Sequence, residues 1–183
     1  MGDATPRKRY VFLPAPNLKN SKLDATKTIQ LEEKCQIKSS TAIDSSLLEN
    51  SYPPRDGVFG EAATAYMQKI INFLVPNGSP LLANIYPYFA YANDQTNIQL
   101  EYAIFNQQDN NDVGYQNLFD AMLDSTYATL EKICANNLQN VVSESGWPCF
   151  GGVGALIQNA GTYYQNLINH SSVQELQLNQ FTV

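Results

Sequence analysis

The feature that most constrains the fold is a repeated alternation of strand-like and helix-like segments. Apolar residues recur at helical spacing in three segments: Glu61–Val75, Tyr115–Ala135 and Leu156–Ile168. Each is preceded by a short segment typical of a strand: Gln36–Ile43, Leu81–Tyr86 and Asn140–Glu144. Because strands that alternate with helices form parallel βα units, the sequence predicts an α/β fold, either a doubly wound sheet or part of a barrel. No phosphate loop or dinucleotide fingerprint follows any of the strands, which lowers the doubly wound nucleotide-binding option.

The chain is expected to form one domain with less regular ends. Its 183 residues, 44% of them hydrophobic, suffice for one core but not comfortably for two. Prolines interrupt residues 1–34, which are predicted to form an irregular segment with a partial helix. The alternating segments occupy residues 35–170, and residues 171–183 form a C-terminal tail.

Charge and composition argue against several classes of function. The formal net charge of −6 disfavours nucleic acid as a partner. No apolar run approaches the roughly 18 residues of a membrane span, and the N-terminus lacks the apolar stretch of a secretory signal. The three cysteines are scattered, and His170 is the only histidine, so neither a metal site nor a Ser-His-Asp triad is expected. We therefore expect no metal and no cofactor.

The best candidate for chemistry is Glu144, which ends a predicted strand. A stiff turn, Ser145–Pro148, follows it and fixes the direction of its carboxylate. In a βα barrel the chemistry gathers at the carboxyl ends of the strands, and a cluster of aromatic residues leaves the preceding strand at the same end: Tyr86, Tyr88, Phe89 and Tyr91. By position alone, Glu144 fits a glycosidase nucleophile and a residue that caps the turn equally well.

The residues around Glu144 resemble a known family. The segment Val141–Pro148, with the sequence VVSESGWP, resembles the signature of plant-type β-1,3-glucanases of glycoside hydrolase family 17, in which the glutamate is the nucleophile. Four further blocks resemble that family in the same order: Ser40–Asp44, Asn50–Pro54, Pro80–Phe89 and Tyr115–Ala121. The resemblance runs from about Leu13 to His170.

The resemblance implies a (β/α)8 barrel that hydrolyses internal bonds of β-1,3-glucan with retention of configuration, by a two-carboxylate mechanism without cofactor or metal. It implies that Glu144 attacks the anomeric carbon, that Asn84, Tyr86 and Tyr91 line the glucan cleft, and that Trp147 lies close to the nucleophile. For each aromatic side chain, packing in the core is about as good an interpretation as contact with sugar. Members of this family are exported to the cell wall or the vacuole and are associated with plant defence.

The sequence departs from the family at both ends. The Gly-Asn-Glu motif that carries the general acid is not found, and residues 171–183 diverge from the family's last strand. Because a full barrel takes about 250 residues, we expect an incomplete barrel that lacks the first strands and the last one. Its open strand edges predict low stability and aggregation or pairing with another chain. Carboxylates that could replace the acid are more readily interpreted as solvated: Asp94, Glu101 and Glu61.

Three interpretations of function remain open at this stage. The first is an endo-β-1,3-glucanase that is truncated and lacks its general acid. The second is a non-catalytic remnant that binds β-1,3-glucan. The third is a fragment that does not fold alone.

Overall fold

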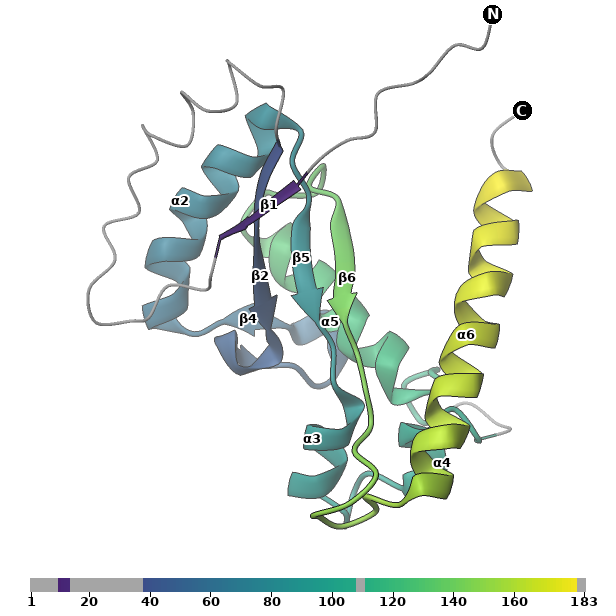
Figure 1. The fold of residues 1–183 in the computed structure, drawn as a ribbon. Coiled ribbons are helices and arrows are strands. Elements are labelled where there is room, and N and C mark those ends of the chain that lie inside the picture. Colours follow the sequence, from purple (N-terminus) through teal and green to yellow (C-terminus); the bar gives the residue numbers. More distant parts are fainter. Residues whose placement is uncertain (1–9, 14–37, 108–110, 181–183) are drawn as a thin grey trace, which may run out of the picture.

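The computed structural model describes residues 10–13, 38–107 and 111–180 (Figure 1). The strands are β1 (Tyr10–Leu13), β2 (Lys38–Asp44), β3 (Leu48–Asn50), β4 (Val58–Phe59), β5 (Leu81–Asn84) and β6 (Asn140–Glu144). The α-helices are α2 (Glu61–Asn77), α3 (Pro87–Asn93), α4 (Leu100–Ala103), α5 (Leu118–Lys132) and α6 (Ile157–Gln180). Two short 3-10 helices, η1 (Ser45–Leu47) and η2 (Pro54–Asp56), lie between β2 and β4.

The centre of the fold is a parallel sheet with the strand order β1-β2-β5-β6. All three pairs of neighbouring strands are parallel, so their carboxyl ends lie at one edge of the sheet. The separate pair β3 and β4 is antiparallel and follows β2. A connection through α2 joins β2 to its neighbour β5, and one through α3, α4 and α5 joins β5 to its neighbour β6. This is the βα arrangement that the alternating sequence pattern predicts.

Helices α2 and α5 cover the same face of the sheet, and this distinguishes a barrel from a doubly wound fold. Leu81 packs with the buried residues of α2, whereas Ala83 and Ile85 pack with Phe119 of α5. Side chains two residues apart point to the same side of an extended chain, so Leu81, Ala83 and Ile85 share one face. Doubly wound sheets carry helices on both faces. Coverage of one face is the arrangement of a partial (β/α)8 barrel, with the helices outside.

The helix-forming segments have recognisable ends. Helix α2 ends at Gly78, which adopts the left-handed conformation (φ 56°) and donates its N–H to the carbonyls of Leu74 and Val75. Helix α5 begins after Asn117, whose side chain accepts a hydrogen bond of 2.8 Å from the N–H of Asp120. These local signals explain why the sequence predicts both helices with boundaries close to the observed ones.

Several expectations need correction. Strand β1 lies within residues 1–34, which were expected to be irregular; the rest of that segment is outside the described residues, as are Gln36 and Ile37. Helix α6 continues to Gln180 rather than ending near Ile168, so most of the expected tail is helical. The strand expected at Leu81–Tyr86 ends at Asn84. Helices α3 and α4 were not predicted because segments of seven and four residues are too short to show helical periodicity.

The described part of the chain has no helix that is both long enough and apolar enough to cross a membrane. Its largest cluster of buried apolar side chains joins α2 to β2, β5 and the end of α5. Met67 lies within this cluster and is fully buried.

We predict that Met67→Ala lowers the free energy of unfolding by about 2–5 kcal/mol, because it leaves a cavity between α2 and the sheet. Urea denaturation followed by circular dichroism measures the change. Val75→Ala, at an exposed position of the same helix, is the control and should change the midpoint little. Equal effects of the two substitutions would contradict the packing described for α2.

Candidate active site

Three polar side chains lie side by side at the ends of three neighbouring strands, β2, β5 and β6. In the sheet register Asp44 pairs with Asn84, and Asn84 pairs with Glu144. The register of β5 with β6 shifts by one residue between Ala83 and Asn84, so β6 contains one extra residue at this point. Such an irregularity redirects the side chains that follow it. The shift therefore brings Glu144, rather than Ser143, into the row of strand ends.

Glu144 is exposed at the carboxyl end of β6 and is held by Tyr86. The Tyr86 hydroxyl donates a hydrogen bond of 2.8 Å to Oε2 of Glu144. Within the described part of the chain, Oε1 of Glu144 accepts no hydrogen bond. The carboxylate is thus held through one oxygen on an exposed side chain.

The contact with Glu144 also raises the pKa of Tyr86. The largest cause is the hydrogen bond to the carboxylate, followed by burial of the phenol and by the negative charge of Glu144. Loss of the phenolic proton would remove the hydrogen bond and place two negative charges together. Tyr86 therefore remains a neutral hydrogen-bond donor to Glu144 across the neutral pH range.

Asn84 joins the two strands on either side of the register shift. The Ser143 hydroxyl donates a hydrogen bond of 2.7 Å to Oδ1 of Asn84. The Asn84 side chain is half-buried, and it also lines the pocket next to the strand ends. The amide oxygen is therefore fixed by the protein, and the orientation of the amide group is set before any ligand binds.

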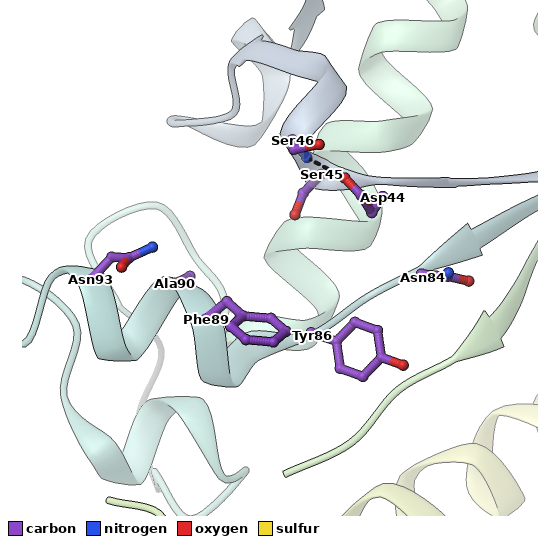
Figure 2. Close-up of a pocket in the computed structure, with 8 residues that line it drawn as sticks. All are labelled: Asp44, Ser45, Ser46, Asn84, Tyr86, Phe89, Ala90 and Asn93. Atoms are coloured by element: carbon purple, nitrogen blue, oxygen red, sulfur yellow. Dashed lines mark hydrogen bonds between the residues drawn. The ribbon is translucent and has the colours of Figure 1, made fainter. Parts of the chain in front are cut away.

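A pocket of about 450 Å³ lies beside this row (Figure 2). Eight residues line it: Asp44, Ser45, Ser46, Asn84, Tyr86, Phe89, Ala90 and Asn93. Figure 2 shows Asp44 and the serines on one side and the residues of α3 on the other. Phe89 is 60% exposed and lies edge-on to Tyr86, with ring centroids 5.7 Å apart. The pocket thus combines polar groups with an exposed aromatic ring, a combination suited to sugar.

Trp147 and Tyr91 lie beneath the site and are not among the residues that line the pocket. Their exposed fractions are 3% and 9%, and their rings are 5.6 Å apart at 34°. The Trp147 indole N–H donates to the Gly154 carbonyl at 2.9 Å, and the ring also packs against Tyr163. In this structure Trp147 anchors the turn that contains it and Tyr91 packs against the Trp147 ring, whereas Asn84 and Tyr86 line the pocket.

The rings of Tyr91, Trp147, Tyr163 and Tyr164 form an aromatic layer, and this layer also fixes the turn after Glu144. Ser145 shares a hydrogen bond with the Tyr163 hydroxyl, and the Tyr164 hydroxyl accepts from the Trp147 N–H at 3.4 Å. A Cβ at Gly146 would lie 2.9 Å from the Tyr164 hydroxyl oxygen, so this position requires glycine or a shift of Tyr164. Helix α6 therefore sets the path of the chain that follows Glu144.

The other carboxylates considered from the sequence do not line this pocket. Asp94 caps a turn after α3, and hydrogen bonds from the Asn97 side chain and backbone hold its pKa below the usual range. Glu61 and Glu101 lie exposed in the first turns of α2 and α4. The carboxylate that does line the pocket is Asp44, which accepts a 2.8 Å hydrogen bond from the Ser46 N–H. Sequence reasoning did not single out Asp44 or Ser143 as site residues, although both lie in segments quoted for the resemblance.

No group of three or more metal-ligating side chains occurs among the described residues. His170 pairs with Asp120 at 2.8 Å and so joins α6 to α5.

Comparison with known proteins identifies the family. The sequence profile of Glycosyl hydrolases family 17 matches residues 7–176. The chain belongs to this family. It is 65% identical over 162 residues to a glucan endo-1,3-beta-glucosidase of Glycine max, a match that covers 87% of this chain and 63% of the relative. It is 55% identical over 139 residues to a protein of the same name from Vitis vinifera, with 74% of this chain and 40% of the relative covered. The chain thus spans less than two thirds of the length of these relatives.

Comparison with solved structures also finds family 17 glucanases. This chain is similar to CJP38, a beta-1,3-glucanase and allergen of Cryptomeria japonica pollen. The TM-score is 0.73, the identity is 41%, and the match covers 79% of this chain and 47% of that one. It is also similar to a structure from a study of two plant beta-glucan endohydrolases with distinct substrate specificities, with a TM-score of 0.75, 34% identity and coverage of 88% and 56%. The incomplete (β/α)8 barrel predicted from the sequence is thereby confirmed.

We predict that Glu144→Gln lowers the pKa of Tyr86 toward the ordinary tyrosine value, because the charged acceptor that favours the neutral phenol is lost. Titration of 13C-labelled tyrosine by NMR, with the Tyr86 signal assigned from Tyr86→Phe, measures the shift. Glu101→Gln is the control and should leave the Tyr86 signal unchanged. An unchanged Tyr86 pKa in Glu144→Gln would contradict the contact.

We predict that Gly154→Ala displaces the aromatic layer below the site. Gly154 has φ +66°, and a Cβ there would lie 2.7 Å from the Tyr91 ring. Since Trp147 is the only tryptophan, its fluorescence reports the change, and we expect a shift to longer wavelength as the indole becomes solvated. Gly151→Ala is the matched control, because Gly151 also has positive φ (+91°) but no atom within 4 Å of the added Cβ. Identical emission spectra for both variants would contradict the role of the Tyr91 contact.

Proposed function

We propose that this chain carries the nucleophile side of a retaining β-1,3-glucan hydrolase, with Glu144 as the nucleophile. The observation that carries the proposal is the hydrogen bond from Tyr86 to one carboxylate oxygen of an exposed glutamate at the end of β6. Family membership and the names of the relatives support β-1,3-glucan as the substrate. The proposed reaction is cleavage of bonds within the glucan chain.

The first chemical step follows from this geometry. An oxygen of Glu144 attacks the anomeric carbon, and the bond from that carbon to the leaving oxygen breaks, with its electron pair leaving on the oxygen. Tyr86 holds Oε2, so Oε1 is the oxygen directed at the substrate. Water then hydrolyses the glycosyl ester, and the carboxylate is restored.

The substrate would occupy the pocket beside the strand ends. We propose that Asn84 and Tyr86 contact the sugar directly, since both line the pocket. Tyr91 and Trp147 are proposed to act on the substrate through the turn they support, because both are buried. A sugar could stack directly on the Tyr91 or Trp147 ring only if the aromatic layer moved apart and exposed that ring.

A natural glucan also needs a general acid to protonate the leaving oxygen. Asp44 is the carboxylate that lines the pocket, and one of its oxygens accepts a hydrogen bond from the Ser46 N–H. Because the Gly-Asn-Glu motif of the general acid is not found in this sequence, we propose that this chain performs attack by Glu144 more readily than full turnover of glucan. A leaving group that needs no proton separates the two steps.

We predict that a 2-fluoro-β-laminaribioside with a dinitrophenolate leaving group labels the chain covalently at Glu144. The fluorine slows breakdown of the ester, and dinitrophenolate leaves without protonation, so labelling requires only the nucleophile. Intact-mass spectrometry and peptide mapping detect the added disaccharide. Glu144→Gln should not be labelled, and Glu101→Gln, which also removes a carboxylate, should be labelled like the original chain.

Release of reducing ends from a soluble linear β-1,3-glucan completes the test. We expect slow or no release by the original chain and none by Glu144→Gln. Fast release that is lost in Glu144→Gln would show that a carboxylate of this chain supplies the acid. Absence of both labelling and release would overturn the proposed catalytic role.

A glucan-binding function without catalysis is the second candidate. The exposed Phe89 ring beside Asn84 and Tyr86 favours it, because these groups form a sugar-binding surface that does not depend on Glu144. Binding of laminari-oligosaccharide without covalent labelling would support this candidate over the first. Phe89→Ala should then weaken binding.

A further inference from the structure

The connection between β6 and α6, residues 145–156, carries the most exposed large apolar side chain among the described residues. This side chain is Phe150, which is 82% exposed and follows Glu144 by six residues. In a βα barrel, the connections that follow the carboxyl ends of the strands form the face where ligands bind. Figure 1 shows this connection beyond the carboxyl ends of β5 and β6, next to α3. Phe150 therefore lies at the same edge of the fold as Glu144.

Close contacts with α3 fix the backbone next to Phe150. A Cβ at Gly152 would lie 2.1 Å from the hydroxyl oxygen of Tyr88. A Cβ at Gly154 would lie 2.7 Å from the Tyr91 ring. Both tyrosines belong to α3, so glycine is what lets the connection approach this helix so closely. The Phe150 ring is thus held out from a packed segment, and a ligand that covers it has little backbone freedom to remove.

A row of aromatic rings leads from the pocket to this connection. Tyr86 and Phe89 both line the pocket, and their ring centroids are 5.7 Å apart. The next ring is Tyr88, whose centroid lies 5.6 Å from that of Phe89. The Tyr88 hydroxyl adjoins Gly152, which is two residues from Phe150. The surface therefore continues from the pocket across α3 to Phe150.

The charge of this surface suits a neutral ligand. No Asp, Glu, Lys or Arg occurs from Ile85 to Asn93 or from Ser145 to Gln174. An exposed aromatic ring on an uncharged surface offers a flat apolar face, while the polar groups of a sugar can remain in water. A chain of glucose units carries no charge, so its binding here would leave no ionised group without a partner.

We propose that Phe150 is a specificity-determining residue, whose ring stacks on a glucose unit of a β-1,3-glucan chain that extends beyond the pocket. This inference rests on the proposed function, because it concerns the same substrate. The pocket binds the sugar units next to Glu144, and Phe150 binds a unit farther along the glucan. Phe150 therefore favours chains long enough to reach it from the pocket, and shorter oligosaccharides gain nothing from it.

Binding of oligosaccharides of two lengths tests the proposal. In isothermal titration calorimetry, Phe150→Ala should raise the dissociation constant for laminarihexaose by about tenfold, because the apolar face that the sugar covers is lost. The dissociation constant for laminaribiose should change much less, since two sugar units fill only the pocket. Unchanged binding of laminarihexaose by Phe150→Ala would overturn the proposal. So would equal weakening for both lengths, or no binding of laminarihexaose by the original chain.

Three further variants separate stacking on a ring from general apolar contact. Phe150→Tyr keeps a flat ring and should bind laminarihexaose like the original chain. Phe150→Leu keeps an apolar side chain without a ring and should bind as weakly as Phe150→Ala. Val153→Ala is the matched control, because Val153 is 50% exposed in the same connection but carries no ring. Equal weakening by Val153→Ala and Phe150→Ala would overturn the assignment to the ring, and the emission of Trp147 checks that each variant keeps the aromatic layer.

Covalent labelling of Glu144 separates this inference from the proposed function, because calorimetry needs no reaction. Binding of laminarihexaose that depends on Phe150, without labelling, would support the role of Phe150 and count against Glu144 as the nucleophile. Labelling of Glu144 together with binding that is independent of Phe150 would overturn the role of Phe150 and leave the proposed nucleophile supported.

Discussion

The hydrogen-bonded register of β2, β5 and β6 is the constraint on which the site depends. Parallel pairing places Asp44, Asn84 and Glu144 in one row at the carboxyl edge. The one-residue shift next to Asn84 decides which β6 side chain joins the row. Without it, Ser143 would oppose Asn84, and the hydrogen bond from Tyr86 to Glu144 would require a different path of the chain.

A second layer, made of aromatic rings, holds the row in place. Trp147 packs against Tyr88, Tyr91 and Tyr163, which come from α3 and α6. This cluster joins α3, which follows β5, to the turn after β6, while Tyr86 and Glu144 contact each other directly through their hydrogen bond. Burial of these rings contributes stability and also limits the movement of the turn that follows Glu144. The aromatic residues near the site thus fall into two groups. Trp147 and Tyr91 are buried in the supporting layer, and Phe89 and Tyr86 line the pocket.

The same sheet that builds the site leaves its own edges open. Helices α2 and α5 protect one face, and the clusters around Met67 and Phe119 provide the core for that side. The outer sides of β1 and β6 pair with no other strand among the described residues.

The sequence by itself determined the parallel βα order, the strand at Asn140–Glu144, the positions of α2 and α5, and the family, because helical periodicity and the VVSESGWP segment are local properties. It did not determine β1, α3 or α4, whose lengths are too short for periodicity to identify. It also could not separate a barrel from a doubly wound sheet by pattern, since that depends on which face the helices cover.

Only the tertiary structure decided that Asp44 joins the pocket, that Ser143 holds Asn84, and that Trp147 and Tyr91 lie in the core while Tyr86 holds the carboxylate. These outcomes depend on strand register and on packing between segments about 40 to 60 residues apart, which no local pattern encodes.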